Sequence, residues 1–144
     1  MQAIKNIIFD LGGIFLTLDF KRTENAFLDL GVTNFSELYS QHHATDLFEL
    51  LETGKISPGE FYEKFREASG TLISDDDIKN AWTAMLLDFP LDRIHRLDEV
   101  RNRYRVFLFS NTNQIHYDYF SQIFRNKTGN KELNSYFIKA YYSH

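Results

Sequence analysis

Two polar turns, each at the end of a short apolar segment, carry the residues best suited to chemistry. Asp10 follows the apolar run at residues 4–9, and Ser110 and Asn111 lie where the run at 105–110 ends. A carboxylate, a hydroxyl and an amide in such positions can bind or react with a ligand. Aspartate at a strand end is also a common turn former, and Ser-Asn-Thr-Asn is an ordinary loop composition. Residue type alone therefore leaves both interpretations open.

The segments that precede these turns are typical of buried β-strands. Residues 4–9 are apolar and β-branched and stop at Gly12-Gly13, residues 105–110 read R-V-F-L-F-S, and a third strand is predicted at residues 136–142. Residues 14–18 are apolar again, which predicts a short extended flap. If the strands are parallel neighbours, both polar turns lie on one rim of the sheet, where ligands of open α/β sheets bind.

The stretch between the first two strands has helical periodicity. Ser57-Pro58-Gly59-Glu60 is a capping box with proline in the first helical position, and Gly70 can end that helix. The predicted helices span residues 45–54, 57–70, 74–87, 91–103 and 114–125. This order predicts a parallel α/β sheet with a helical module inserted after its first strand. We expect the α/β core at residues 1–17 and 96–144, and the helical insert at residues 18–95.

Composition limits the classes of protein that remain. The 144 residues are 43% hydrophobic and 25% charged, as expected for a folded domain, and the net charge of −4 offers no basic stripe for nucleic acid. The absence of cysteine excludes disulfides, thiol catalysis and cysteine-bound zinc. Because no membrane-spanning run and no secretory leader are recognisable, we expect a cytoplasmic protein without membrane or nucleic-acid partners.

The segments N-I-I-F-D-L-G-G-I-F and V-F-L-F-S-N-T-N resemble motifs I and II of the haloacid dehalogenase-like (HAD) hydrolase superfamily. The two motifs occur in the family's order, with a helical insert of suitable size between them. The similarity runs over essentially the whole chain. It implies a Rossmann-like parallel sheet with an inserted helical-bundle cap, similar to the sugar-phosphatase-like branch.

The resemblance assigns chemistry to particular residues. It makes Asp10 the nucleophile that attacks phosphorus and forms an aspartyl intermediate, Ser110 a hydrogen-bond donor to the phosphoryl group, and Asn111 a residue that orients substrate. Mg²⁺ is held by Asp10 and the backbone carbonyl of Gly12, and the helix after Asn113 adds partial positive charge. The implied activity is a Mg²⁺-dependent phosphatase of small phosphorylated metabolites, such as sugar phosphates.

Two departures from the family pattern affect this expectation. Gly12 stands where many family phosphatases carry a second aspartate, the general acid and base; the sugar-phosphatase branch also has glycine there, and dehalogenases also lack the second aspartate. Asp19 is a candidate substitute, although a turn-forming role is favoured. The chain ends at His144, before the family's motifs III and IV, and Lys139 lies within a strand. We therefore expect a truncated HAD core with impaired activity and weak Mg²⁺ binding.

The helical segment contributes further candidates. His42-His43 is interpreted either as a metal or substrate contact or, preferably, as a solvated helix end, and Tyr39 and Phe48 are candidates for the cap surface above the site. Trp82, Phe61, Phe65 and Leu86 are spaced as bundle core; this set is read as packing. Three functions stay open: the phosphatase, a metal-independent haloacid dehalogenase, and a non-catalytic remnant or binding module.

Overall fold

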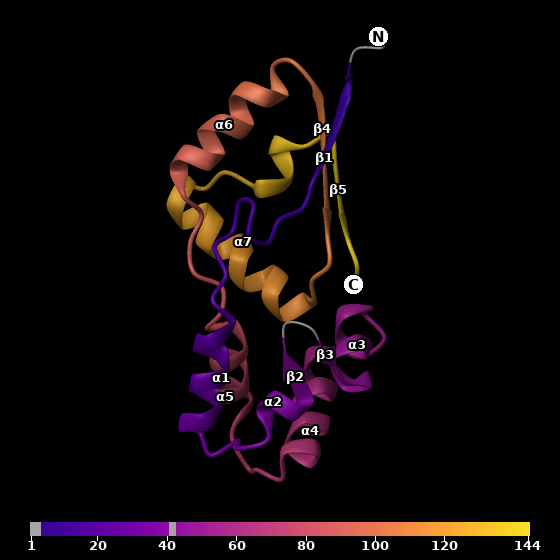
Figure 1. Ribbon diagram of the computed structural model, residues 1–144, viewed down its shortest axis with the longest axis vertical. Helices are drawn as coiled ribbons and strands as arrows, with labels where there is room; N and C mark the ends of the chain where they lie inside the picture. Colours follow the sequence, from indigo (N-terminus) through magenta and orange to yellow (C-terminus); the bar gives the residue numbers. More distant parts are fainter. Residues whose placement is uncertain (1–3, 41–42) are drawn as a thin grey trace.

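The computed structural model describes residues 4–40 and 43–144 of the chain. The molecule is elongated, with a three-stranded sheet and its helices at one end and a second group of helices at the other (Figure 1). The sheet contains β1 (Asn6–Phe9), β4 (Arg105–Ser110) and β5 (Lys139–Tyr142), in the order β1-β4-β5. Both strand pairs are parallel, which confirms the predicted parallel α/β sheet.

Helices cover one face of this sheet. They are α6 (Leu91–Arg101), α7 (Gln114–Thr128) and the short 3₁₀ helix η1 (Leu133–Tyr136). In Figure 1 all of them lie on the same side of the strands. The α6 helix contacts both β4 and η1. Because α6 spans residues 91–101, it crosses the boundary between helical insert and core that the sequence analysis placed between residues 95 and 96.

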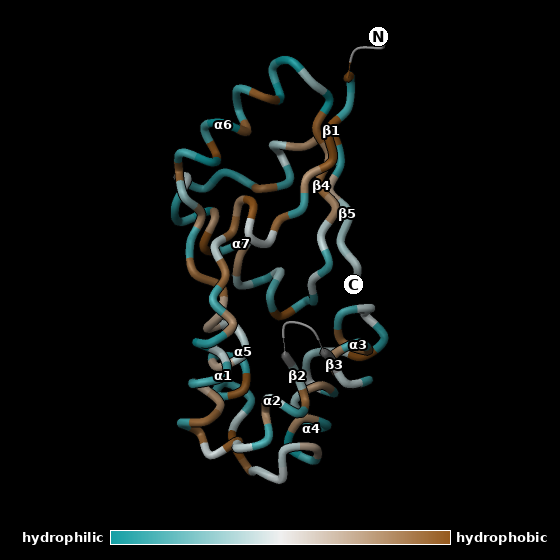
Figure 2. Tube along the Cα trace, viewed as in Figure 1, coloured by the Kyte–Doolittle hydropathy of each residue, from teal (hydrophilic) through white to brown (hydrophobic). Residues whose placement is uncertain are grey.

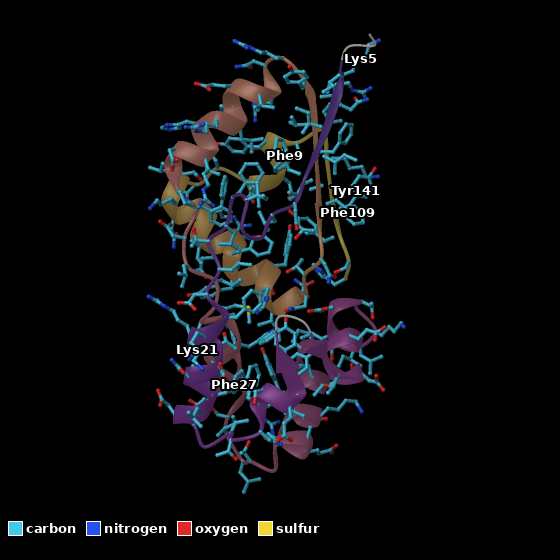
Figure 3. The ribbon with its side chains drawn as sticks, viewed as in Figure 1. Lys5, Phe9, Lys21, Phe27, Phe109 and Tyr141 are labelled. Carbon is cyan, nitrogen blue, oxygen red and sulfur yellow. The ribbon has the colours of Figure 1, made fainter. Side chains whose placement is uncertain are left out.

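The opposite face of the sheet is uncovered within the described part of the chain, which corrects the expectation of fully buried strands. Ile8 is 70% exposed and Phe109 66% exposed, while Val106 and Leu108 are buried under the helices. Figure 2 shows hydrophobic colour along β1 and β4, and in Figure 3 Phe109 and Tyr141 project away from α7. The uninterrupted apolar runs resemble those of two-faced parallel sheets, so their composition alone suggested burial on both faces.

The second group of helices, with a short β-hairpin, surrounds an aromatic core. Its elements are α1 (Phe20–Asp29), α2 (Phe35–Leu38), β2 (Tyr39–Ser40), β3 (His43–Ala44), α3 (Asp46–Glu52), α4 (Pro58–Ser69) and α5 (Asp75–Thr83). The rings at its centre are fully buried or nearly so: Phe27, Phe35, Phe48, Phe61, Phe65 and Trp82. Many of these rings meet edge to face, as Phe48 and Phe61 do at 5.4 Å between centroids. The prediction that the aromatic set is bundle core is confirmed for Trp82, Phe61 and Phe65.

Local sequence signals fix several helix ends. Ser57 and Glu60 form the predicted reciprocal capping box of α4, and Gly70 ends the helix in the left-handed conformation at φ 68°. The α5 helix ends at Thr83, earlier than expected. The residues after it leave the helix and pair with the segment that connects the sheet to α1, where Leu87 N donates to Thr17 O at 2.9 Å. Tertiary pairing thus overrides the helical pattern there.

Candidate active site

The register of the sheet brings the two polar turns to one rim. Phe9 pairs with Leu108, so Asp10 and Ser110 lie at the carboxyl ends of adjacent parallel strands. The Asp10 side chain is exposed, and its Oδ1 accepts a hydrogen bond from Leu11 N at 2.7 Å. The carboxylate therefore faces solvent at the rim and is free to meet a ligand.

The loop after Asp10 is a compact turn and differs from the extended flap expected at residues 14–18. Phe15 N and Leu16 N both donate to Leu11 O, at 3.0 and 3.1 Å, and Gly13 N donates to Leu16 O at 2.8 Å. Arg93, from α6, clamps the loop by donating to two of its carbonyls. Within the described residues the Gly12 carbonyl accepts no hydrogen bond, so it is available to a cation.

Gly12 is also closely approached by a neighbour. A Cβ placed on this residue would lie 2.9 Å from Leu18 Cδ1, so any side chain here requires Leu18 to move. Leu18 is held near this position because its backbone forms an antiparallel β-bridge with Leu86, which follows α5 in the chain. The packing therefore fits glycine at this position.

A cleft lies between the strand ends and the helical region. Its cavity volume is about 100 Å³. Gly12, Ser110, Asn111, Thr112 and Asn113 line the side that belongs to the sheet, which we call the strand wall. Leu18, Phe20, Tyr39, Glu52, Met85 and Leu86 line the opposite side, which we call the helical wall. In Figure 1 the lower ends of β4 and β5 point toward α3 and the β2–β3 hairpin. Asp10 is exposed and does not itself line this cleft, but the next two residues, Leu11 and Gly12, do.

The cleft continues toward a larger hollow. This hollow has a volume of about 270 Å³ and shares Phe20, Tyr39 and Met85 with the cleft. The two spaces are therefore neighbours, separated by these shared side chains. Leu86, predicted only as bundle core, is buried but also lines the cleft.

The amino end of α7 gives the strand wall an anion-binding character. Asn113 caps this helix, its Oδ1 accepting from His116 N at 3.0 Å, while its Nδ2 is buried and has no partner among the described residues. Ser143 holds the adjacent Thr112 through hydrogen bonds to its N–H and carbonyl. Free donors at the positive end of a 15-residue helix favour an anionic ligand. Within the described residues the Ser110 hydroxyl has no hydrogen-bond partner either.

His116, on α7, also lines the cleft and contacts Trp82 of the helical region. Its ring stacks on Trp82 at 4.5 Å between centroids, and its Nε2 lies 3.0 Å from the Trp82 carbonyl oxygen. Burial lowers the pKa of His116 to about 4, although the bond to the carbonyl opposes the shift. The imidazole is therefore neutral near pH 7. Sequence reasoning did not single out His116, because a histidine in the first turn of a helix carries no distinguishing signal.

Glu52 and Tyr39 supply the polar groups of the helical wall. Glu52 Oε2 lies 3.5 Å from Asn111 Nδ2. Burial, and the charge of Glu49, raise the pKa of the Glu52 carboxyl, while the Asn111 amide opposes the rise. Burial and the charge of Glu52 raise the pKa of Tyr39 to about 12. Sequence analysis missed Glu52, since one glutamate at a helix end is unremarkable.

Of the other sequence candidates that the structure describes, Tyr39 lines the cleft and the rest do not. Phe48 is fully buried in the aromatic core. Asp19 caps α1 by accepting from Lys21 N at 3.1 Å, in agreement with a turn-forming role. Lys139 is in β5, with its ammonium over the Tyr141 ring. His42 lies outside the described residues, and His43 belongs to β3.

The described ranges, 4–40 and 43–144, lack two kinds of feature. They contain no group of three or more His, Cys, Asp or Glu side chains that could hold a metal ion. They also contain no helix with the length and apolar character needed to cross a membrane.

Comparisons with known proteins agree with this geometry. No protein-family model matches the chain. It is 31% identical over 141 residues to D-ribitol-5-phosphate phosphatase of Bacteroides thetaiotaomicron, covering 98% of this chain and 68% of that protein.

Solved structures show the same fold. A variant of an HAD family enzyme of Bacteroides thetaiotaomicron, in complex with magnesium and inorganic phosphate, superposes with a TM-score of 0.91 at 35% identity, covering 98% of this chain and 69% of the other. A predicted HAD-like family hydrolase of Porphyromonas gingivalis gives a TM-score of 0.83 at 30% identity, covering 97% and 66%. With its motifs, its fold and these relatives in agreement, the chain belongs to the HAD family.

Proposed function

We propose that this chain is a Mg²⁺-dependent phosphatase of small phosphorylated metabolites that works through an aspartyl-phosphate at Asp10. The observation that carries the proposal is the strand register, which aligns the exposed Asp10 carboxylate with Ser110 on one rim. A free Gly12 carbonyl and the amino end of α7 lie at the same rim. The phosphatase and the magnesium–phosphate complex found among the relatives support the same chemistry.

The residues of the strand wall divide the work. The Asp10 carboxylate attacks the phosphorus, the bond to the leaving oxygen breaks, and that oxygen takes a proton from solvent water. Water then attacks the phosphorus, the bond between the phosphorus and the Asp10 oxygen breaks, and phosphate leaves with the Asp10 carboxylate restored. Ser110 donates a hydrogen bond to a phosphoryl oxygen, and Asn113 Nδ2 with the α7 amino end stabilises its negative charge. Asn111 orients the rest of the substrate.

The oxygen donors at the rim fit a hard cation. Mg²⁺ in phosphoryl-transfer sites uses one or two carboxylates plus substrate oxygens and water, so Asp10 and the Gly12 carbonyl are a sufficient start for a weak site. When bound, the ion supplies positive charge against the phosphoryl oxygens and the attacking carboxylate.

The substrate proposed is a phosphorylated sugar or sugar alcohol. The relative named for D-ribitol 5-phosphate supports this class, and the cleft pairs an anion site with further polar groups. We also propose that residues 18–95 act as a cap that selects substrate, over a core at residues 1–17 and 96–144. In that division α6 belongs with the core by its contacts. The cytoplasmic location stays a prediction.

Glycine at position 12 favours one competing function, a haloacid dehalogenase, since halide leaves without a proton. Phosphate release from D-ribitol 5-phosphate and from a panel of sugar phosphates, with Mg²⁺ and with chelator, separates the candidates. We expect phosphate release that stops with chelator. Halide release from a 2-haloacid that is insensitive to chelator would indicate the dehalogenase. No turnover of either class would indicate a non-catalytic binding module.

A further inference from the structure

The carboxylate of Glu52 lies in an environment that is unfavourable for a negative charge. It is the last residue of α3, at the negative end of the helix dipole, and it is partly buried. Glu49 lies one turn earlier on the same helix. Among the side chains that the structure describes, which exclude those of residues 40–44, Glu52 forms no ion pair. Partial burial, the helix dipole and the charge of Glu49 all disfavour an ionised carboxylate at this position. A carboxylate in such a place is a candidate for a functional group.

Its position is defined relative to the strand wall. Glu52 Oε2 meets Asn111 Nδ2 at 3.5 Å, the outer limit of a hydrogen bond. Ser110, Asn111 and Glu52 line the same cleft, so Glu52 borders the space open to a ligand whose phosphoryl group lies at Ser110. A carboxylate offers about four acceptor positions, and one long bond leaves most of them open.

We infer that Glu52 selects the substrate, accepting hydrogen bonds from hydroxyl groups of a phosphorylated polyol whose phosphoryl group lies at Asp10 and Ser110. This inference rests on the proposed function and adds a residue to it. The hydroxyl groups supply the donors that the carboxylate lacks.

The neighbours of Glu52 suit the same ligand. Tyr39 stays protonated at any physiological pH, because its pKa is about 12, so its hydroxyl can donate or accept. Met85 and Leu86 line the same wall and offer apolar contact to a carbon chain. A polyol presents both kinds of surface, with hydroxyl groups on a carbon backbone.

A purely structural role for Glu52 makes a different prediction. If its bond to Asn111 only ties the helical wall to the strand wall, removing it disturbs the cleft for every ligand equally. If Glu52 selects the substrate, only ligands with hydroxyl groups lose affinity. The comparison therefore needs two phosphates of equal carbon length that differ in their hydroxyl groups.

The experiment compares D-ribitol 5-phosphate with n-pentyl phosphate as substrates of the full chain in Mg²⁺. The variants are Glu52→Ala and Glu52→Gln, with Glu49→Gln as the matched control on the same helix. For Glu52→Ala we expect a loss of about 10- to 100-fold in kcat/KM with ribitol phosphate, mainly through KM, as for a lost charged hydrogen bond. Glu52→Gln, which keeps an acceptor, loses less. With pentyl phosphate the kcat/KM of every variant stays within about twofold of that of the unmodified chain, because this substrate has no hydroxyl group for Glu52 to bind.

Each other outcome is decisive. An equal loss on both phosphates overturns the inference in favour of a structural tie, and so does an unchanged kcat/KM on ribitol phosphate. A fall in kcat on both substrates, with loss of the basic limb of the pH profile, overturns it in favour of a proton donor. If the unmodified chain turns over neither phosphate, the proposed function fails, and this inference fails with it.

Discussion

The two walls of the cleft are built in different ways. The strand wall consists of short polar side chains and backbone groups that are positioned by strand register and by the α7 helix cap. The helical wall consists of larger side chains, placed by the packing of an aromatic core. From this contrast we propose that the strand wall carries the chemistry, and that the helical wall sets the shape and selectivity of the cleft. Changes to the first should lower rates, and changes to the second should lower stability or alter selectivity.

The largest effect on stability is expected at Trp82, where the helical wall meets His116. Trp82 is fully buried and contacts Phe48, Tyr39 and His116 within about 5 Å between ring centroids. Trp82→Ala should lower the free energy of unfolding by about 3–5 kcal/mol, because it leaves a large cavity. Urea denaturation followed by circular dichroism measures the loss.

The matched control for Trp82 is an apolar side chain outside the core. Leu72 is 98% exposed, so Leu72→Ala should change the free energy of unfolding by less than about 0.5 kcal/mol. Similar losses for the two variants would contradict a helical wall that depends on its aromatic core.

The junction between the walls should respond to pH through His116. Its folded-state pKa of about 4 lies below the unfolded value of 6.5, so the unfolded chain binds the proton more tightly. The neutral imidazole therefore favours folding above pH 6.5, and this contribution declines as the pH falls toward 4. The expected loss is on the order of 3 kcal/mol.

Comparison with His116→Phe isolates this contribution, since the carboxylates titrate equally in both proteins. The stability difference between the unmodified chain and His116→Phe should shrink between pH 7 and pH 4.5. The exposed His95, changed to Gln, serves as the control for loss of a histidine at the surface. A constant difference for His116→Phe would show that the imidazole is not held neutral.

On the strand wall, Ser110→Ala should lower kcat/KM for phosphate esters by about 10- to 100-fold, the range for a hydrogen bond to a charged group. Stability should change little, since within the described residues the hydroxyl has no partner to lose. Ser121→Ala, on α7, is the control and should leave kcat/KM unchanged. Loss of stability without loss of rate at Ser110 would reverse the roles assigned to the two walls.

Two results of the sequence analysis can be traced to local signals. The shared rim of Asp10 and Ser110 was predicted because an apolar run followed by a polar turn marks the end of a buried or half-buried strand, and parallel pairing then brings such ends together. The α4 helix was found because Ser57 and Glu60 encode its start within four residues. In both cases the interactions that matter are close in sequence or follow from one pairing rule.

Glu52 and His116 could not be found in this way. Glu52 was singled out by its contact with Asn111, and His116 by its contact with Trp82. Both partners are distant in sequence and come together only when the sheet region and the helical region pack. The exposed face of the sheet was missed for a related reason. Ile8 and Phe109 have the residue types of a buried strand, and only the arrangement of the helices shows which face is covered.

The smallest expected effect lies far from the cleft, at the α4 cap. Ser57→Ala removes the hydroxyl that accepts from Glu60 N and should cost about 1 kcal/mol of stability. Its kcat/KM should match that of the unmodified chain. Glu63→Gln, exposed on the same helix, is the control for stability. A change in kcat/KM for Ser57→Ala would show that the helical region transmits local changes to the cleft.

The central claim, that Asp10 is the group that becomes phosphorylated, has a direct test. The chain is mixed with D-ribitol 5-phosphate and Mg²⁺, quenched in acid during turnover, digested, and its peptides are weighed by mass spectrometry. We expect a phosphoryl group on the peptide that contains Asp10, and none in the Asp10→Asn variant. Phosphate release without a phosphorylated Asp10, or a phosphoryl group that persists in Asp10→Asn, would contradict the account.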